Sequence, residues 1–200
     1  TFCLFNKLPD RGYSIAKPFG IAIISWISWI LASLHIIPAN KYTLLLLLIL
    51  FTTANGYLAF KRKRELLAFI RREFKILLSI ETLFLVFCLA WILFRLFDPN
   101  INTTEKPMDF AFLNSAIISD YFPPEDPWLI GHNINYYYFG YLMMANLTEL
   151  SLVPSRISYN LALSLIASMA AIGAIGIAYN LIRVSGSSKV KAISVALMCP

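Results

Sequence analysis

Charged residues are scarce in this sequence, and their scarcity excludes an ordinary soluble domain. Only 14% of the residues are charged and 58% are hydrophobic, whereas about a quarter of the residues of a typical soluble domain are charged. The apolar runs are too long and too numerous to form one buried core helix. The sequence therefore predicts an all-α integral membrane protein that lies in a lipid bilayer.

Cysteine is scarce as well, and its three positions favour neither disulfides nor a metal centre. Cys3, Cys88 and Cys199 are scattered in apolar contexts without the spacing of metal ligands. We expect them to behave as small buried hydrophobic residues. A cleavable signal peptide is not expected either, because the first apolar run lacks a small-residue cleavage site and further runs follow it.

The net charge of +6 does not indicate a nucleic-acid-binding protein. Seven of the 17 basic residues lie in segment 61–75, between two apolar runs. Such a cluster is typical of a loop on the cytoplasmic side. Apolar residues at helical spacing predict that its second half lies flat on the inner leaflet, with anionic lipids as partners. A solvated basic loop would have the same sequence pattern.

Acidic residues are concentrated in another loop, segment 98–135. It holds six of the 11 acidic residues and one base, Lys106. The asymmetry between the two loops predicts that 61–75 lies inside and 98–135 outside the cytoplasmic (plasma) membrane.

The apolar runs predict a single polytopic helical domain over residues 1–200. Twenty helical residues cover the hydrocarbon core of about 30 Å. The expected spans are 18–37, 42–60, 76–97, 136–153 and 158–182, and another begins near residue 193. The chain opens without Met and stops inside an apolar run, so we expect it to be part of a longer protein.

Segment 136–153 is a borderline span with two possible topologies. If it crosses the membrane, Arg183, Lys189 and Lys191 lie outside, against the charge rule; if it only dips in, they lie inside. The short turn at Pro154 favours a full crossing. Segment 158–182 carries a stripe of small residues that predicts a close approach between helices.

The outer loop holds the residues with the clearest potential for chemistry. Pro107 predicts the start of a juxtamembrane helix over 108–122, with Asp109 in its first turn. Glu125 and Asp126 lie in a stiff proline-containing loop. Their oxygens suit a divalent cation such as Mg²⁺ or Mn²⁺, although a solvated turn explains them equally well.

Three further polar features flank these acids, namely an arginine, a histidine and a run of tyrosines. Arg95 lies near the outer end of its span, where we expect it to extend to the interface or to contact a lipid phosphate. His132 lies in the turn that follows the acidic pair. Tyr136, Tyr137 and Tyr138 stand where the chain re-enters the membrane, where an aromatic belt explains some tyrosines without a function. Their rings and hydroxyl groups would also suit a sugar or a lipid headgroup.

The runs MDFAFLNSAIISDYFPPEDPW and INYYYFGY resemble the signature of an uncharacterised family of large prokaryotic membrane proteins named for its Tyr-Tyr-Tyr motif (Chlor_Arch_YYY). The upstream run LPDRGYSIAKPFG is similar to that family too, so the likeness extends from residue 8 to about residue 180. That family has no established activity, so the resemblance implies none for this chain.

More distantly, the order of parts is similar to that of the C-type glycosyltransferase superfamily (GT-C), which includes protein mannosyltransferases and aminoarabinose transferases. The resemblance implies a GT-C-like N-terminal part, in which Asp109 matches the catalytic Asp that opens a large outer loop. The superfamily often has Glu after that Asp, whereas Phe110 follows here. A second acidic residue would come from a later loop, or here from Glu125 or Asp126.

The resemblance implies transfer of a sugar from a polyprenyl-phosphate donor to an acceptor at the outer face. Asp109 would act as general base or, with Asp126, as a metal ligand. Arg95 or His132 would contact the phosphate. The rival classes are a transporter, for which only Glu81 and Glu149 are candidates at membrane depth, and a non-catalytic membrane scaffold.

Overall fold

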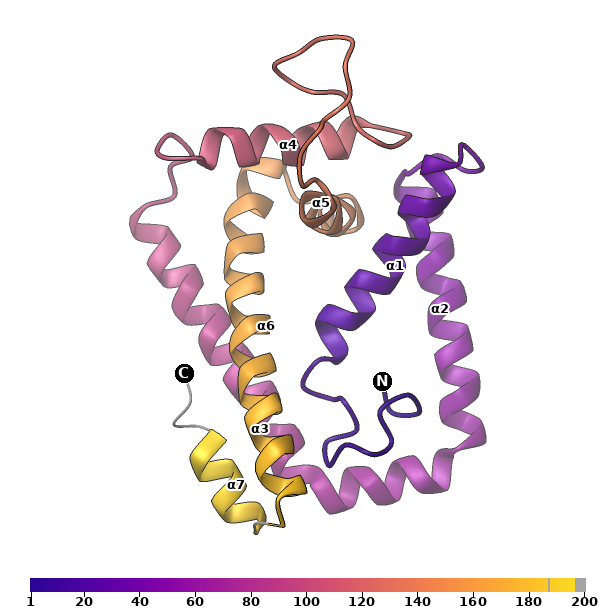
Figure 1. Ribbon diagram of the computed structural model, residues 1–200, viewed down its shortest axis with the longest axis vertical. Coiled ribbons are helices and arrows are strands. Elements are labelled where there is room, and N and C mark those ends of the chain that lie inside the picture. The colour runs from indigo at the N-terminus through magenta and orange to yellow at the C-terminus, as the bar shows by residue number, and fades with distance from the viewer. Residues whose placement is uncertain (187, 197–200) are drawn as a thin grey trace. The chain divides into compact units, whose positions relative to one another are not determined.

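The computed structural model describes residues 1–186 and 188–196, and its regular structure is helical (Figure 1). In this part of the chain no strand forms, and the one β-bridge is an isolated pair between Glu125 and Asn133. The helices are α1 (Ala16–Ser33), α2 (Lys41–Lys61), α3 (Lys63–Phe97), α4 (Lys106–Ile118), α5 (Phe139–Ser151), α6 (Ser155–Val184) and α7 (Lys189–Ala196). The prediction of an all-α protein is confirmed.

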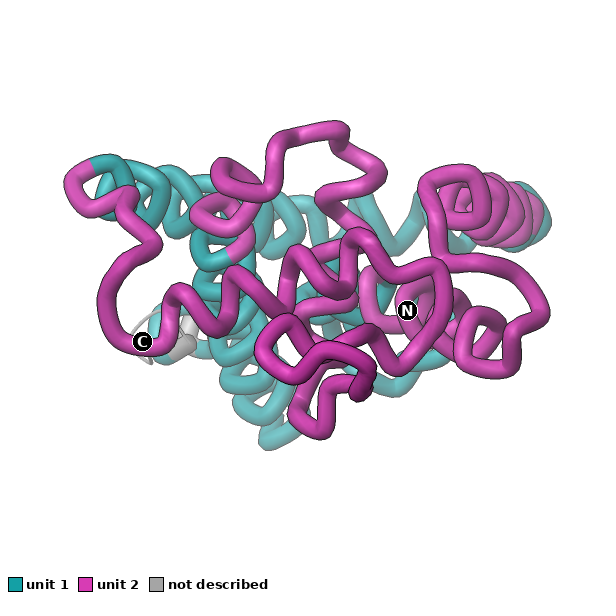
Figure 2. Tube along the Cα trace, turned by 90° about the horizontal axis from the view of Figure 1, so that it is seen from above, with its two compact units in different colours: residues 1–20, 58–96, 163–200 teal, residues 21–57, 97–162 magenta. Residues whose placement is uncertain are grey.

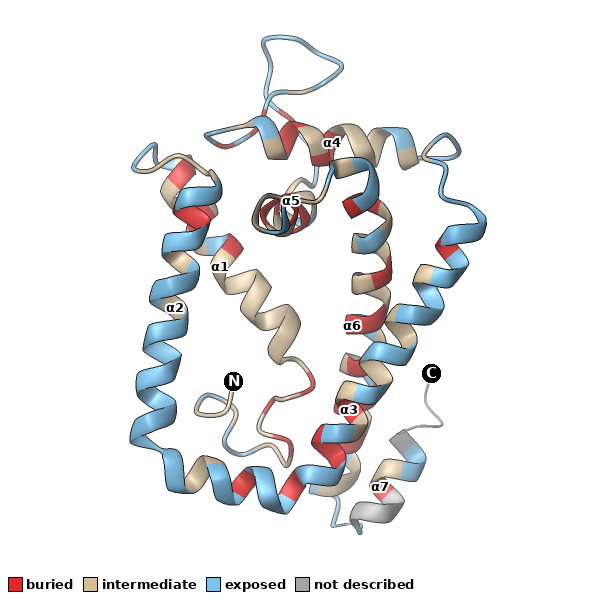
Figure 3. Cartoon of the chain, turned by 180° about the vertical axis from the view of Figure 1, so that it is seen from behind, coloured by how far each residue is buried: buried red, intermediate tan, exposed pale blue. Residues whose placement is uncertain are grey.

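Four of these helices are long and apolar enough to cross a membrane, namely α1, α2, α3 and α6. A helix satisfies its backbone hydrogen bonds internally, which is the condition for crossing hydrocarbon. Most of α2 is exposed, as Figure 3 shows, although it is rich in leucine. An apolar helix that the protein leaves uncovered is suited to face lipid. The chain is therefore an integral membrane protein.

The chain forms two compact units, which Figure 2 distinguishes by colour. Unit 1 comprises residues 1–20, 58–96 and 163–200, and unit 2 comprises residues 21–57 and 97–162. Each unit is described by itself below.

In unit 1, the N-terminal segment packs against α3 and α6. Asp10 is fully buried, and its carboxylate accepts hydrogen bonds from the backbone N–H groups of Gly12 and Ser14, the Ser14 hydroxyl and the Asn180 amide. Arg11 forms an ion pair with Glu65 of α3 at 2.6 Å. These contacts tie a loop to two helices that are distant from it in the sequence.

Helix α3 begins earlier than the predicted span at 76–97, because it takes in most of the basic segment. Figure 1 shows that its first part runs across the direction of the rest. Most side chains of this first part are exposed, while Phe69 and Glu73 are buried. The basic segment is thus helical and bent away from the rest of α3, while its placement on the inner leaflet stays a prediction.

In unit 2, α4 and α5 pack against each other. Helix α5 has 13 residues, which rise about 20 Å and fall short of the hydrocarbon core of about 30 Å. Figure 1 shows α5 end-on while α2 runs up the page, so α5 lies across the direction of this span. Helix α5 is thus not among the helices long enough to cross a membrane, and the predicted crossing by 136–153 stays a prediction.

The end of α5 has a local cause. Leu152 adopts a left-handed conformation with φ 57° and caps the helix, and Pro154 follows before α6 begins. The apolar residues of α5 serve packing instead, since Leu142, Met144 and Ala145 are buried. The span predicted to begin near residue 193 falls on the short helix α7, and its continuation beyond residue 196 lies outside the described residues.

Candidate functional site

The candidate site is built on α4, whose first turn carries Asp109. Pro107 stands at the start of the helix, where its missing N–H costs no hydrogen bond. The helix ends at Ile118, four residues before the predicted end, because Ser119 is already extended. The expected position of Asp109 in the first turn of this helix is confirmed.

The side chain of Asp109 is held by a tyrosine from α5. The Tyr141 hydroxyl donates a hydrogen bond to Asp109 Oδ1 at 2.5 Å. Burial raises the pKa of Tyr141 above its usual range, and the hydrogen bond and negative charge of Asp109 raise it further. The phenol therefore stays protonated at neutral pH and remains a donor to the carboxylate.

A cluster of aromatic rings surrounds this pair. Phe112 lies three residues after Asp109 on α4, where it is buried. Its ring contacts those of Trp128, Tyr136 and Tyr141 at centroid distances of 5.6, 5.7 and 5.6 Å. Phe112 thus joins the loop, the tyrosine run and α5 at one point beside Asp109.

The three consecutive tyrosines have different environments. Tyr138 accepts a hydrogen bond from Trp29 Nε1 at 2.8 Å, and its ring stacks on that of Phe122. Tyr136 is half exposed, and Tyr137 is 83% exposed. Tyr138 thus packs within the protein, whereas Tyr136 and Tyr137 are exposed. An aromatic belt therefore does not explain the three tyrosines equally well.

Glu125 and Asp126 lie in a turned loop beyond α4. Their neighbourhood is ordered by the bridge between Glu125 and Asn133 and by the Ser115 hydroxyl, which donates to the Glu125 carbonyl at 2.5 Å. Asp126 Oδ1 accepts the backbone N–H groups of Trp128 and Leu129 at 2.8 and 3.3 Å. The Asp126 carboxylate therefore helps to form its own turn, as the solvated-turn alternative requires.

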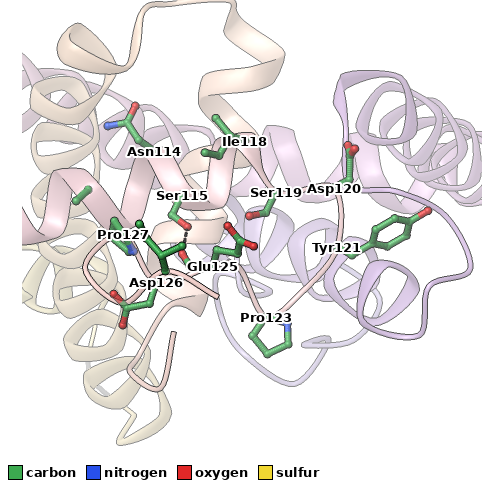
Figure 4. A pocket seen from close by; sticks show the side chains of 12 residues that line it. Asn114, Ser115, Ile118, Ser119, Asp120, Tyr121, Pro123, Glu125, Asp126 and Pro127 are labelled. Atoms are coloured by element: carbon green, nitrogen blue, oxygen red, sulfur yellow. Dashed lines mark hydrogen bonds between the residues drawn. The ribbon is translucent and has the colours of Figure 1, made fainter. Parts of the chain in front are cut away.

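The acidic pair borders a cavity of about 620 Å³ between the loop and α4. Its polar lining comprises Asn114, Ser115, Ser119, Asp120, Glu125 and Asp126. Figure 4 shows that the carboxylates of Asp120, Glu125 and Asp126 point in different directions. Asp109 does not line this cavity, so the structure places it and the acidic pair at two separate sites.

A metal centre is not evident from the arrangement of side chains. Within residues 1–186 and 188–196, no three His, Cys, Asp or Glu side chains are placed to hold a metal ion. A divalent cation held by Asp109 and Asp126 stays a prediction. Because the oxygens of these two residues have different local partners, such a site would require a substrate group or another segment to complete it.

Arg95 and His132 are the remaining predicted residues. Arg95 lies in the last turn of α3, in unit 1, and is buried instead of extending outward. His132 is exposed in the loop, where its carbonyl accepts the Asp126 N–H at 2.8 Å. Their proposed contacts with a phosphate stay predictions.

Sequence reasoning missed three residues of this site: Tyr141, Phe112 and Trp29. The spacing within the Tyr-Tyr-Tyr run gives one signal, because Tyr141 follows it by one helical turn and so returns to the same face. Nothing in the sequence pairs Trp29 with Tyr138, which lies 109 residues later.

A family model described as an uncharacterized membrane protein family, DUF2298, matches residues 23–199. The match covers most of the chain, and the chain belongs to this family. No curated protein and no solved structure matches it. Membership in an uncharacterised membrane protein family is thus confirmed, while the Tyr-Tyr-Tyr family name and the resemblance to the C-type glycosyltransferases stay predictions.

Proposed function

We propose that this member of the DUF2298 family is a glycosyltransferase. It would move a sugar from a polyprenyl-phosphate donor to an acceptor at the outer face of the plasma membrane. The observation that carries the proposal is the hydrogen-bonded pair of Asp109 and Tyr141, at the start of a helix that follows a membrane span. The resemblance to the C-type superfamily supplies the reaction class.

In the proposed reaction, Asp109 acts as general base. The acceptor oxygen attacks the anomeric carbon, the bond between that carbon and the phosphate oxygen breaks, and polyprenyl phosphate leaves with the electron pair. Asp109 takes the proton of the acceptor. Tyr141 binds Oδ1, and Oδ2 accepts no hydrogen bond from the described residues, so this second oxygen is available for the proton.

Glu125 and Asp126 would serve the acceptor in this proposal. Together with Asp120 they give the adjacent cavity a negative lining, which suits an acceptor with hydroxyl or amino groups. If a Mg²⁺ or Mn²⁺ ion takes part, Asp109 and Asp126 would be its protein ligands, with a substrate group or another segment completing the site, and the ion would help to neutralise the departing phosphate.

The transporter alternative is weakened by the surroundings of Glu81. Its carboxylate accepts hydrogen bonds from the Tyr13 hydroxyl at 2.7 Å and from Lys17 Nζ at 2.5 Å. This pairing within unit 1 gives a structural reason for an acid in α3, and a transport path is not needed to explain it. The scaffold alternative predicts that Asp109 can be replaced without functional loss.

The proposed reaction requires α4 and α5 on the outer side, and the charges support that topology. With four crossings by α1, α2, α3 and α6, segment 61–75 and Arg183 lie inside, while segment 98–154 lies outside. All the large basic clusters then lie on the cytoplasmic side. A topology with four crossings avoids the conflict with the charge rule that a fifth crossing by 136–153 would create.

Cysteine labelling of intact cells tests this topology. Ile130 is 92% exposed at the loop tip and Ser185 is exposed just after α6. In a background without the natural cysteines, a membrane-impermeant maleimide should label Ile130→Cys in intact cells, but Ser185→Cys only after permeabilisation. Labelling of both positions in intact cells would show that 136–153 crosses after all.

Donor turnover tests the proposed activity. The full-length protein in membranes is expected to release polyprenyl phosphate from a mixture of polyprenyl-phosphate sugars, in proportion to the amount of protein and with transfer to an acceptor. Membranes without the protein provide the baseline. If no sugar in a mixture of hexoses, pentoses and amino sugars is consumed, the glycosyltransferase proposal fails.

A further inference from the structure

A second cavity in unit 2 lies between α1 and the tyrosine run. It has a volume of about 420 Å³ and is lined by Trp26, Trp29, Tyr136, Tyr137, Tyr138, Phe139 and Gly140. Six of these seven residues are aromatic, and they come from two segments more than 100 residues apart in the sequence. This lining is called the aromatic cleft below. Its volume is in the range of small-molecule sites.

One wall of the aromatic cleft is fixed by interactions among its own side chains. The Trp29 indole donates to the Tyr138 hydroxyl at 2.8 Å and meets the Phe139 ring edge-to-face at a centroid distance of 6.0 Å. Gly140 adds no side chain, and a Cβ there would have no neighbour within 4 Å. The cleft is therefore partly preorganised and has open space beside its glycine.

Other rings of the cleft are exposed. Trp26 is 54% exposed and Tyr137 is 83% exposed, although aromatic side chains contribute a large apolar area when they are buried. Trp26 precedes the end of α1 at Ser33 by seven residues, which is about 10 Å along a helix. In the proposed topology the cleft thus reaches from the outer interface into the apolar part of the outer leaflet.

The aromatic cleft is also connected to Asp109. The Tyr136 ring stacks on Phe112, Phe112 contacts Tyr141, and Tyr141 hydrogen-bonds to Asp109. A lipid chain in the cleft would therefore have its polar end near the outer interface, on the side where the proposed reaction takes place.

We propose that the aromatic cleft binds the isoprenoid chain of a lipid-linked substrate. The inference rests on the proposed function, because a polyprenyl-phosphate sugar is its donor. The apolar lining and the depth of Trp26 favour a hydrocarbon chain over a sugar ring. An isoprenoid chain suits rigid ring walls better than a straight acyl chain, because its double bonds remove rotatable bonds and less conformational entropy is lost on binding.

Binding of a polyprenyl phosphate to the full-length protein in detergent, followed by native mass spectrometry, tests the inference. Trp26→Ala and Tyr137→Ala are each expected to weaken binding about tenfold, since each removes a ring face from the ligand. Both side chains are largely exposed, so the variants should fold like the parent. Tyr57→Ala is the matched control, because Tyr57 is 66% exposed on α2 and lies outside the cleft.

An alkyl phosphate with a straight chain of similar length is the second control, and it is expected to bind more weakly than the polyprenyl phosphate. Equal binding of the two lipids, or equal binding by the parent and both cleft variants, would overturn the inference. Lost binding in the cleft variants of a protein that transfers no sugar would leave the cleft assignment standing and refute the glycosyltransferase. Donor turnover that depends on Asp109 but has the same KM in the cleft variants would support the glycosyltransferase and refute the cleft assignment.

Discussion

Asp109→Asn is expected to lower the rate of sugar transfer by about 10²–10⁴-fold, the usual contribution of a positioned general base. The amide keeps the size of the side chain and can still accept the Tyr141 hydrogen bond through its oxygen, but it cannot take a proton from the acceptor. The measurement is release of polyprenyl phosphate with time, at donor concentrations above and below KM. The loss should appear in kcat, with little change in KM.

Asp98→Asn is the matched control. Asp98 is an exposed acid of the same segment between α3 and α5 and pairs with Lys106 at 3.0 Å, so this variant makes the same chemical change at a different carboxylate. Its rate should match that of the parent. A folded Asp109→Asn protein with the parent's rate would remove Asp109 from the mechanism and direct attention to Glu125 and Asp126.

Tyr141→Phe separates positioning from proton transfer. The variant keeps the ring contact with Phe112 and loses the hydroxyl that holds Asp109 Oδ1. Since Asp109 itself remains, the expected loss in kcat is smaller than in Asp109→Asn, about tenfold, and it reflects a less ordered base. A loss as large as that of Asp109→Asn would mean that the hydroxyl itself takes part in the reaction.

The membrane spans could be predicted from the sequence because the signal is composition over a fixed length. Helices α2 and α6 are 21 and 30 residues long and each contains a membrane-length apolar stretch, which is the pattern of a membrane span. Helix α5 has the same local composition for another reason. Its buried Leu142 and Ala145 lie in unit 2, where α5 packs on α4, and hydropathy does not distinguish burial in protein from burial in lipid.

The candidate site could be predicted only in part. The position of Asp109 follows from local signals, namely a proline and an acid at the start of a helix. Its partner Tyr141 is 32 residues away, and the pair depends on the way in which α4 packs on α5. The same holds for Trp29 and Tyr138. Contacts of this kind leave no periodicity in the sequence.

The stripe of small residues on α6 also makes a contact that the sequence alone does not identify. The stripe predicts a close approach between helices, but at Gly176 it is the N-terminal segment of unit 1 that approaches. A Cβ on Gly176 would lie 2.0 Å from Ser14 Oγ and 2.2 Å from Ser14 Cβ. Gly173, one turn earlier on α6, has open space where its Cβ would lie.

Gly176→Ala is therefore expected to destabilise the protein by about 3 kcal/mol, at the upper end of the usual cost of overpacking. Ser14 Cβ is fixed to the backbone, so a rotamer change does not relieve the clash and the segment must move. Ser14 also donates two hydrogen bonds to buried Asp10, which this movement would weaken. Unfolding in detergent, measured as the shift in denaturant midpoint, gives the effect.

Gly173→Ala and a double variant distinguish this explanation from a general loss of helix flexibility. Alanine at Gly173 should be neutral or stabilising by up to about 1 kcal/mol, because it favours the helix and meets no neighbour. Removing the Ser14 side chain also removes the clash, since the Ser14 Cα would lie 3.7 Å from the new Cβ. The combination of Gly176→Ala with Ser14→Gly should therefore cost less than the sum of the two single changes. Additive costs would show that the N-terminal segment does not pack against α6 at this glycine.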